Sequence, residues 1–273
     1  MTIAAGYVAS DGVLICADTE HADDVAKYKK PKAFKLKQHL IVTGAGNSHL
    51  LKVATDRLFR TLAQPPADAN AALDIVGDVI YELHERHIFN RYDAASHLRP
   101  TLSLIVAVRC ADGKLTLIKT QDDSAAFGGA YASAGSGSHL FEYWASHFFD
   151  RQLDTEAASY LLLFVLREVK HHVPGCGGDS HVWVLNQDTD RWSKSGLVDE
   201  DVILAEFPRS VAQLLVDCID YPATSDGRFK ESTENFVRKI NELRESLKAT
   251  RSIETQRQLL STFGTSTLRP SQE

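Results

Sequence analysis

The chain carries TIAAGYVASDGVLICAD at positions 2–18, and this segment predicts two antiparallel β-strands joined by a tight turn. Thr2–Ala9 alternates in part and is apolar enough for a half-buried strand. Ser10-Asp11-Gly12 predicts the turn, because glycine accepts the positive φ that hairpin turns require. Val13–Ala17 is a continuous apolar run, which is typical of a strand covered on both faces. Since such a hairpin returns the chain to its start, we expect Asp18 to lie close to Thr2.

Asp18 closes this apolar strand, and a buried carboxylate needs a partner. The obvious candidate is Lys32, which opens the next predicted strand, KAFKL at 32–36. Thr2 becomes the N-terminal residue when Met1 is removed. From the residues alone, Thr2 could simply start a strand, and Asp18 and Lys32 could form a purely structural ion pair.

An N-terminal threonine, an aspartate that ends the second strand and a lysine that opens the third resemble the pattern of the proteasome β-type subunits. That family includes the bacterial HslV-type and Anbu-type peptidases. The matching residues here are Thr2, Asp18 and Lys32. With Met1 removed, Asp18 falls at the family's spacing from the threonine, whereas the loop from Asp18 to Lys32 is somewhat shorter than is usual.

A second hairpin is predicted from Ala33–Gln38 and His39–Thr43, and the segment GAGNS at 44–48 leads from it into a helix that Asn47 or Ser48 can cap. A glycine just before a helix lets a backbone N–H approach a ligand. Taken alone, Gly46 is better explained by a turn that needs small residues. The resemblance adds a role, because the family carries here a glycine whose amide forms the oxyanion hole, and Gly46 matches it.

Residues 101–134 predict four short strands, and the turn Gly135-Ser136-Gly137-Ser138 then opens an amphipathic helix. A glycine-serine turn by itself carries no functional signal. In the resembling family, a Gly-Ser-Gly at this place supplies a serine that hydrogen-bonds the N-terminal residue. Ser136 is the matching residue.

The match weakens at Pro174-Gly175-Cys176-Gly177-Gly178. The family has Asp-x-x-Ser-Gly-Gly here, and its Asp and Ser help to orient the threonine. Aligning the glycines places Cys176 at the serine and Val173 at the aspartate. A thiol hydrogen-bonds poorly and valine not at all, so the departure bears on catalysis rather than on the fold. Asp179 is a candidate to compensate.

Charge and composition exclude several classes of function. Thirty Lys+Arg against 36 Asp+Glu give a net charge of −6, which argues against a dedicated nucleic-acid surface. No apolar run approaches the length of a membrane span, and the first residues lack the pattern of a signal peptide. The four cysteines are far apart, which favours free thiols in a reducing compartment, so a cytoplasmic location is expected. His84-Glu85-Arg86-His87 lacks the spacing of a zinc site and is interpreted as a helix face.

The order of predicted elements favours two antiparallel sheets packed together between helical layers. The resemblance implies the same α+β architecture, the four-layer αββα sandwich of the N-terminal-nucleophile (Ntn) hydrolases. We expect this domain to occupy residues 1–198. Residues 199–273 predict a helical extension, with helices over 202–216 and 231–247 and a polar tail at 267–273, which cannot be matched to the family.

The resemblance implies a threonine-type endopeptidase that hydrolyses amide bonds of peptides or unfolded proteins without a metal or organic cofactor. Its catalytic residues would be Thr2, Asp18, Lys32, Gly46 and Ser136, and its substrate-binding residues are not predicted. One residue would supply both nucleophile and base, because a free α-amino group has an intrinsic pKa of about 7.7–8.0. Family members work as rings, so a homo-oligomeric ring is expected. Whether an ATPase is its partner is not predicted.

Two other classes of function stay open at this point. The chain could be an Ntn amidase that acts on a small molecule, which would not require a ring. It could also be a catalytically inactive assembly subunit of proteasome type, which Val173 and Cys176 make credible.

Overall fold

The computed structural model describes residues 2–22, 27–93, 99–149, 153–187 and 194–196, and residues 234, 237, 238, 241, 242 and 245. The chain divides into two units, Met1–Val198 and Asp199–Glu273. In the second unit the described residues are helical and fall within the helix predicted over 231–247. The helix predicted over 202–216 and the tail at 267–273 lie outside the described residues, so the nature of this extension stays a prediction.

The first sheet contains five antiparallel strands in the order β10-β1-β2-β11-β12. Their bounds are Ala4–Val8 for β1, Gly12–Asp18 for β2, Tyr131–Ala134 for β10, Ser180–Asn186 for β11 and Lys194–Gly196 for β12. The predicted N-terminal hairpin is confirmed as β1 and β2, in which Ala4 pairs with Ala17. On its other side Ala4 pairs with Ala134, so β1 lies between two strands.

Gly12 is needed for a different reason from the one expected. It is not among the described glycines with positive φ. A Cβ at this position would instead lie 2.6 Å from Thr155 Cγ2 and 2.9 Å from the carbonyl oxygen of Leu185. Lack of space, rather than backbone conformation, therefore explains the glycine.

The second sheet is also antiparallel and runs β5-β6-β7-β8-β9. Its strands span Ala33–Lys37 for β5, Leu40–Gly46 for β6, Leu102–Arg109 for β7, Leu115–Gln121 for β8 and Ser124–Phe127 for β9. β5 and β6 are the second predicted hairpin, and the four strands expected between 101 and 134 are β7, β8, β9 and β10.

Four helices form the outer layers. They are α1 (Ser48–Thr61), α2 (Ala69–His84), α3 (Ser138–Phe148) and α4 (Thr155–His172). α1 begins after Asn47, whose side chain accepts hydrogen bonds from the backbone N–H groups of His49 and Leu50. α2 continues into a π-helix, Glu85–Phe89. Among the described residues, no helix is long and apolar enough to cross a membrane.

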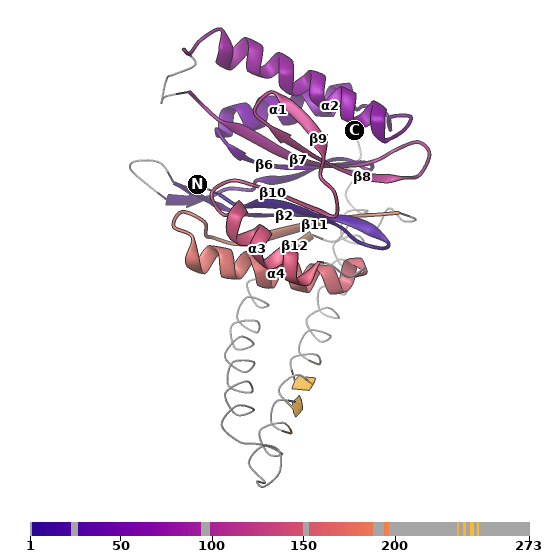
Figure 1. Cartoon of the computed structure of the whole chain (residues 1–273), viewed down its shortest axis with the longest axis vertical. Coiled ribbons are helices and arrows are strands. Elements are labelled where there is room, and N and C mark those ends of the chain that lie inside the picture. Colours follow the sequence, from indigo (N-terminus) through magenta and orange to yellow (C-terminus); the bar gives the residue numbers. More distant parts are fainter. Residues whose placement is uncertain are drawn as a thin grey trace, which may run out of the picture. The chain divides into compact units, whose positions relative to one another are not determined.

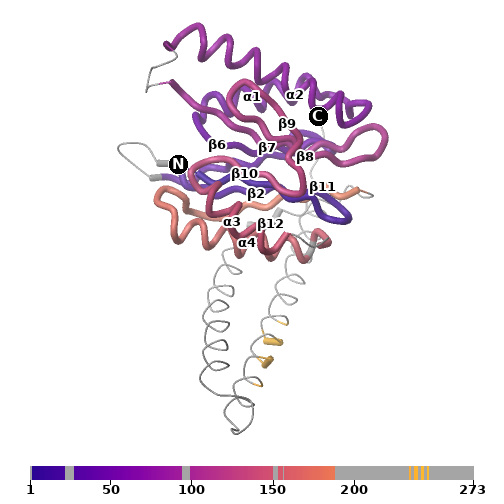
Figure 2. The backbone as a smooth tube through the Cα atoms, in the orientation of Figure 1, coloured from indigo at the N-terminus to yellow at the C-terminus, as the bar shows by residue number. Residues whose placement is uncertain are grey.

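The two sheets face each other, with helices on both outer faces (Figures 1 and 2). α1 and α2 cover the second sheet, and α3 and α4 cover the first. Between the sheets lies an apolar interior of residues such as Ile15, Ile41, Ile105, Leu117 and Leu185. The predicted four-layer αββα sandwich of α+β class is therefore confirmed.

One hairpin of this unit was not predicted. β3 (Glu20–Ala22) and β4 (Lys27–Lys29) pair with each other directly after β2 and form a sheet of two strands. Their sequences, EHA and KYK, are short and rich in charge, so they lack the apolar alternation that marks a strand.

Ile105 should contribute more to stability than Ile75 of α2, because Ile105 is fully buried where the sheets meet and Ile75 is only partly buried. A Cβ added at Gly6 of β1 would lie 3.0 Å from Ile105 Cγ2. We expect Ile105→Ala to lower the free energy of unfolding by about 2–5 kcal/mol in urea denaturation. The matched control, Ile75→Ala on α2, removes a partly buried side chain and should cost clearly less. Equal losses would contradict this placement of the core.

Candidate active site

Asp18 is the last residue of β2, and its side chain is fully buried. Oδ1 accepts hydrogen bonds from Thr2 Oγ1 (2.5 Å) and from the backbone N–H of Ile3 (3.1 Å), and it lies 2.8 Å from Lys32 Nζ. Oδ2 accepts a hydrogen bond from the backbone N–H of Gly177 (3.0 Å). Both oxygens are thus satisfied without water, which is the condition for holding a carboxylate inside a protein.

Lys32 precedes β5, and only 4% of its side chain is exposed. Its Nζ donates to Asp18 Oδ1, to the carbonyl oxygen of Glu20 (2.5 Å) and to Thr2 Oγ1. An ammonium group has three hydrogens, so each of them has an acceptor. Its backbone is held as well, because the Lys32 carbonyl accepts a hydrogen bond from Thr43 Oγ1 (2.9 Å).

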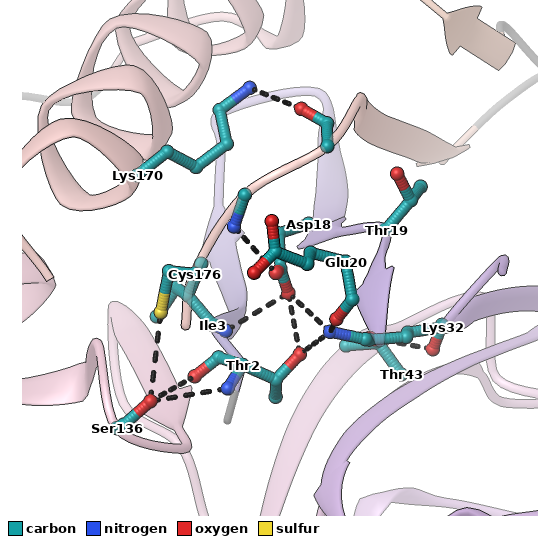
Figure 3. A network of polar contacts seen from close by, with 12 residues as sticks. Thr2, Ile3, Asp18, Thr19, Glu20, Lys32, Thr43, Ser136, Lys170 and Cys176 are labelled. Atoms are coloured by element: carbon teal, nitrogen blue, oxygen red, sulfur yellow. Dashed lines mark hydrogen bonds and ion pairs between the residues drawn. The ribbon is translucent and has the colours of Figure 1, made fainter. Parts of the chain in front are cut away.

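Thr2 lies just before β1 and is 5% exposed. Its hydroxyl contacts both Lys32 Nζ and Asp18 Oδ1, as Figure 3 shows. Its backbone N–H donates to Ser136 Oγ (3.1 Å), and its carbonyl accepts hydrogen bonds from Ser136 Oγ (3.3 Å) and from the backbone N–H of Gly137 (3.2 Å). The structure therefore brings together four of the five candidate residues, Thr2, Asp18, Lys32 and Ser136.

Gly46 ends β6 and has a φ of +116°, a backbone conformation that residues with a side chain rarely adopt. Its neighbour Ala45 lies against the turn that carries Ser136, because a Cβ added at Gly135 would be 3.0 Å from Ala45 Cβ and would overlap the Thr2 carbonyl. Gly46 is thus one residue away from a contact with this turn. Among the hydrogen bonds between described residues, none joins Gly46 to Thr2 directly.

Comparison with known proteins identifies the family. The family described as "Proteasome subunit" matches residues 2–185, which is more than half of the chain. The chain belongs to the proteasome subunit family. A search of curated protein sequences found no match.

Two solved structures show the same fold as this proteasome-family chain. One is an Anbu (Gly-1) mutant from Hyphomicrobium sp. strain MC1, with a TM-score of 0.65 and 14% identity over 81% of this chain and 100% of that chain. The other is the Anbu complex from Pseudomonas aeruginosa, a helical assembly, with a TM-score of 0.64 and 15% identity over 82% and 98%. The predicted resemblance to proteasome-type and Anbu-type subunits is confirmed.

The two departures from the proteasome pattern lie where α4 ends. Val173 is the C-cap of α4, and its backbone N–H donates to the carbonyl of Val169 (2.8 Å). Cys176 is 5% exposed, and its Sγ lies 3.6 Å from Ser136 Oγ. Burial raises the pKa of the Cys176 thiol, which keeps it uncharged. The thiol therefore contacts the serine that holds Thr2.

Asp179, considered as a substitute for the missing carboxylate, binds elsewhere. Its Oδ1 lies 2.9 Å from Lys29 Nζ, and both side chains are partly exposed. Its backbone N–H donates to Thr19 Oγ1 (2.7 Å). The structure thus places the Asp179 carboxylate in a surface ion pair of this proteasome-family chain.

Three groups near the cluster were missed in the sequence. The Glu20 carbonyl and the Gly177 N–H are backbone groups, so the residue type gives no sign of their role. His21 follows Glu20 on β3, and its ring stacks on Tyr28, with the centroids 5.5 Å apart. The pKa of His21 is lowered, first because burial disfavours the charged ring and then because Lys32 and Lys30 lie nearby.

Among the described residues, no group of His, Cys, Asp and Glu could hold a metal ion. His84 is the last residue of α2, and His87 lies in the π-helix that follows it. His84 is buried, and one ring nitrogen lies 3.0 Å from the carbonyl of Ile80.

Replacing Gly46 should destabilise the protein more than replacing a glycine that also has a positive φ but has open space around it. A Cβ at Gly46 would overlap the Thr101 carbonyl oxygen, whereas Gly113, with a φ of +81°, has nothing within 4 Å. We expect Gly113→Ala to show the cost of strain alone, about 1–3 kcal/mol, and Gly46→Ala to exceed it in thermal unfolding. Equal destabilisation of the two variants would refute the close approach at Gly46.

Proposed function

We propose that this chain is a proteasome-like threonine peptidase whose nucleophile is Thr2, exposed by removal of Met1. The observation that carries the proposal is the position of the Thr2 hydroxyl, in contact with both Lys32 Nζ and Asp18 Oδ1. A hydroxyl between a buried cation and a buried anion, on the first residue of a processed chain, suits nucleophilic attack on an amide carbonyl.

The reaction needs only groups of Thr2 and its neighbours. The free α-amine takes the hydroxyl proton while Oγ1 attacks the substrate carbonyl carbon. The tetrahedral intermediate collapses, and the leaving amine receives a proton from the N-terminal ammonium. Water, activated by the same amine, then hydrolyses the ester on Thr2 and regenerates the hydroxyl.

The surrounding residues have distinct roles in this proposal. Lys32 stabilises developing negative charge on Oγ1 and lowers the pKa of the α-amine, as an opposite and a like charge respectively. Asp18 holds Lys32, and Ser136 orients the backbone nitrogen of Thr2. Gly46 donates its N–H to the oxyanion.

Processing of Met1 is a condition for this function, because an amide nitrogen cannot act as the base. Thr2 is small enough for methionine aminopeptidases to act before it. The intact mass of the purified protein would show whether Met1 is absent.

The substrates proposed are peptides or unfolded proteins, cleaved in the cytoplasm inside a homo-oligomeric assembly. The Anbu complex from Pseudomonas aeruginosa forms a helical assembly, which supports association of chains with this fold. A closed ring, and an ATPase that would feed it, are further steps of the same proposal.

Labelling by a peptide epoxyketone, read by mass spectrometry, tests the nucleophile. Thr2→Ala should abolish labelling and leave the fold intact, and Thr2→Ser should retain part of it because the hydroxyl and amine remain. Lys32→Ala should remove nearly all labelling and destabilise the protein by about 3–5 kcal/mol, since Asp18 stays buried without its cation.

The matched control is Lys30→Ala, which removes an exposed lysine two positions earlier and should label like wild type. Undiminished labelling of Thr2→Ala, with Met1 verified absent from the wild type, would end the proposal.

A second candidate function is that of an inactive assembly subunit. It is favoured by Val173 and Cys176, which replace the family's aspartate and serine. No labelling of a wild-type chain that has lost Met1 would select this candidate over the peptidase.

Particle size tests the assembly. We expect light scattering at micromolar concentration to show a homo-oligomer much larger than a dimer, because peptide cleavage in a chamber requires closure. A monomer would contradict the chambered peptidase. A dimer that still labels at Thr2 would instead indicate an amidase for a small molecule.

A further inference from the structure

The turn at residues 175–179, which joins α4 to β11, is bound along the end of β2. The Gly177 carbonyl accepts hydrogen bonds from the N–H groups of Thr19 (3.2 Å) and Glu20 (3.0 Å). The Gly177 N–H donates to Asp18 Oδ2 (3.0 Å), and the Asp179 N–H donates to Thr19 Oγ1 (2.7 Å). Four hydrogen bonds therefore connect this turn to three consecutive residues.

Thr19 lies at the centre of this connection. It stands between Asp18, whose carboxylate binds Lys32 Nζ, and Glu20, whose carbonyl binds the same nitrogen. Thr19 is 2% exposed, and its carbonyl also accepts a hydrogen bond from the Lys30 N–H (2.9 Å).

The packing leaves little freedom at this point. Gly178 has a φ of +71°, and a Cβ there would lie 2.5 Å from Thr19 Oγ1 and 3.0 Å from the Glu20 nitrogen. The turn can approach β2 this closely only because residue 178 is glycine. Thr19 lies between β2 and β3, and its hydroxyl accepts a hydrogen bond from the Asp179 N–H of this turn, whereas the neighbouring bond from the Gly177 N–H goes to the charged Asp18 side chain.

We infer that Thr19 is a positioning residue: its hydroxyl fixes the 175–179 turn onto the Asp18–Glu20 backbone and thereby sets the place of Lys32 Nζ beside Thr2. The structural part of this inference stands on the contacts alone, and its kinetic consequence rests on the proposed peptidase function.

The inference predicts a change in pH dependence that simple destabilisation would not produce. The α-amine of Thr2 acts as a base only when it is unprotonated, and the Lys32 ammonium lowers its pKa. If Lys32 moves away, the pKa of the amine rises, and the acid limb of the rate profile shifts to higher pH.

Other titratable or charged groups face this site. They are Asp18 on β2, Glu20 and His21 on β3, Lys29 on β4, Lys30 after β4, Lys170 on α4, and Cys176 and Asp179 in the turn. The pKa of His21 is lowered and that of Cys176 is raised, so neither moves toward the limb assigned to the amine. Repeating the profile in a His21→Gln background separates the remaining contribution of the imidazole.

The test compares Thr19→Val with Thr19→Ser. Valine keeps the shape of threonine and removes the acceptor for the Asp179 N–H, whereas serine keeps the hydroxyl. The matched control is Thr120→Val, because Thr120 is also fully buried and its Oγ1 accepts a hydrogen bond from the Leu104 N–H (2.8 Å). Thr120 contacts none of the groups that hold Lys32 in the described hydrogen bonds.

For Thr19→Val we expect acylation of Thr2 by the epoxyketone to slow by about tenfold to hundredfold, the size of effect that a small misplacement can have. Its acid limb should move to higher pH, Thr19→Ser should restore both properties, and Thr120→Val should leave the limb in place. Crystal structures should show the contact from Lys32 Nζ to the Glu20 carbonyl broken in Thr19→Val alone.

An unshifted acid limb together with an intact Lys32–Glu20 contact in Thr19→Val would overturn the inference. A shift of equal size in Thr120→Val would do the same, because it would trace the effect to general loosening. If the wild type does not label at all, the proposed function fails, and the crystal structures still decide whether Thr19 holds Lys32.

Discussion

A fully buried carboxylate, that of Asp18, is the constraint on which the architecture around the site depends. An ionised group without water is tolerated only where enough donors converge on it. Here the donors come from the residues before β1, from Lys32 ahead of β5 and from the turn after α4. These segments meet because β2 lies between β1 and β11, with the second sheet packed against it. The order of strands in the first sheet therefore brings together the donors that the buried Asp18 carboxylate needs.

Much of this arrangement could be predicted from the sequence, because its causes are local or periodic. Apolar runs marked β2 and β7. Asn47 was expected to cap a helix, and its side chain does accept the first backbone hydrogen bonds of α1. A charged residue at the end of an apolar strand pointed to a partner, and Lys32 is that partner. The family was recognised from the same residues, and the fold followed from it.

What the sequence did not show is mostly carried by the backbone. The Glu20 carbonyl and the Gly177 N–H have no signature in residue type, although both hold the charged pair. The β3–β4 hairpin is too short and too charged to be detected by its pattern. Gly12 was expected to be glycine for the conformation of a turn, but it begins β2 and is crowded by Thr155, which cannot be seen before the chain is folded. The sequence placed Cys176 and Asp179 near the family's motif, but it could not show what they contact. Cys176 contacts Ser136, and Asp179 pairs with Lys29.

The pairing of β1 on both sides has a practical consequence for the N-terminus. Ala4 is matched to Ala17 and to Ala134 at once, so the strand cannot slide by one residue without turning every side chain to the opposite face. The position of Thr2 is therefore fixed by the pairing of Ala4, two residues downstream. Any residue added ahead of Thr2, such as the remnant of an affinity tag, cannot be absorbed by slippage and would convert the α-amine that the proposed reaction needs into an amide.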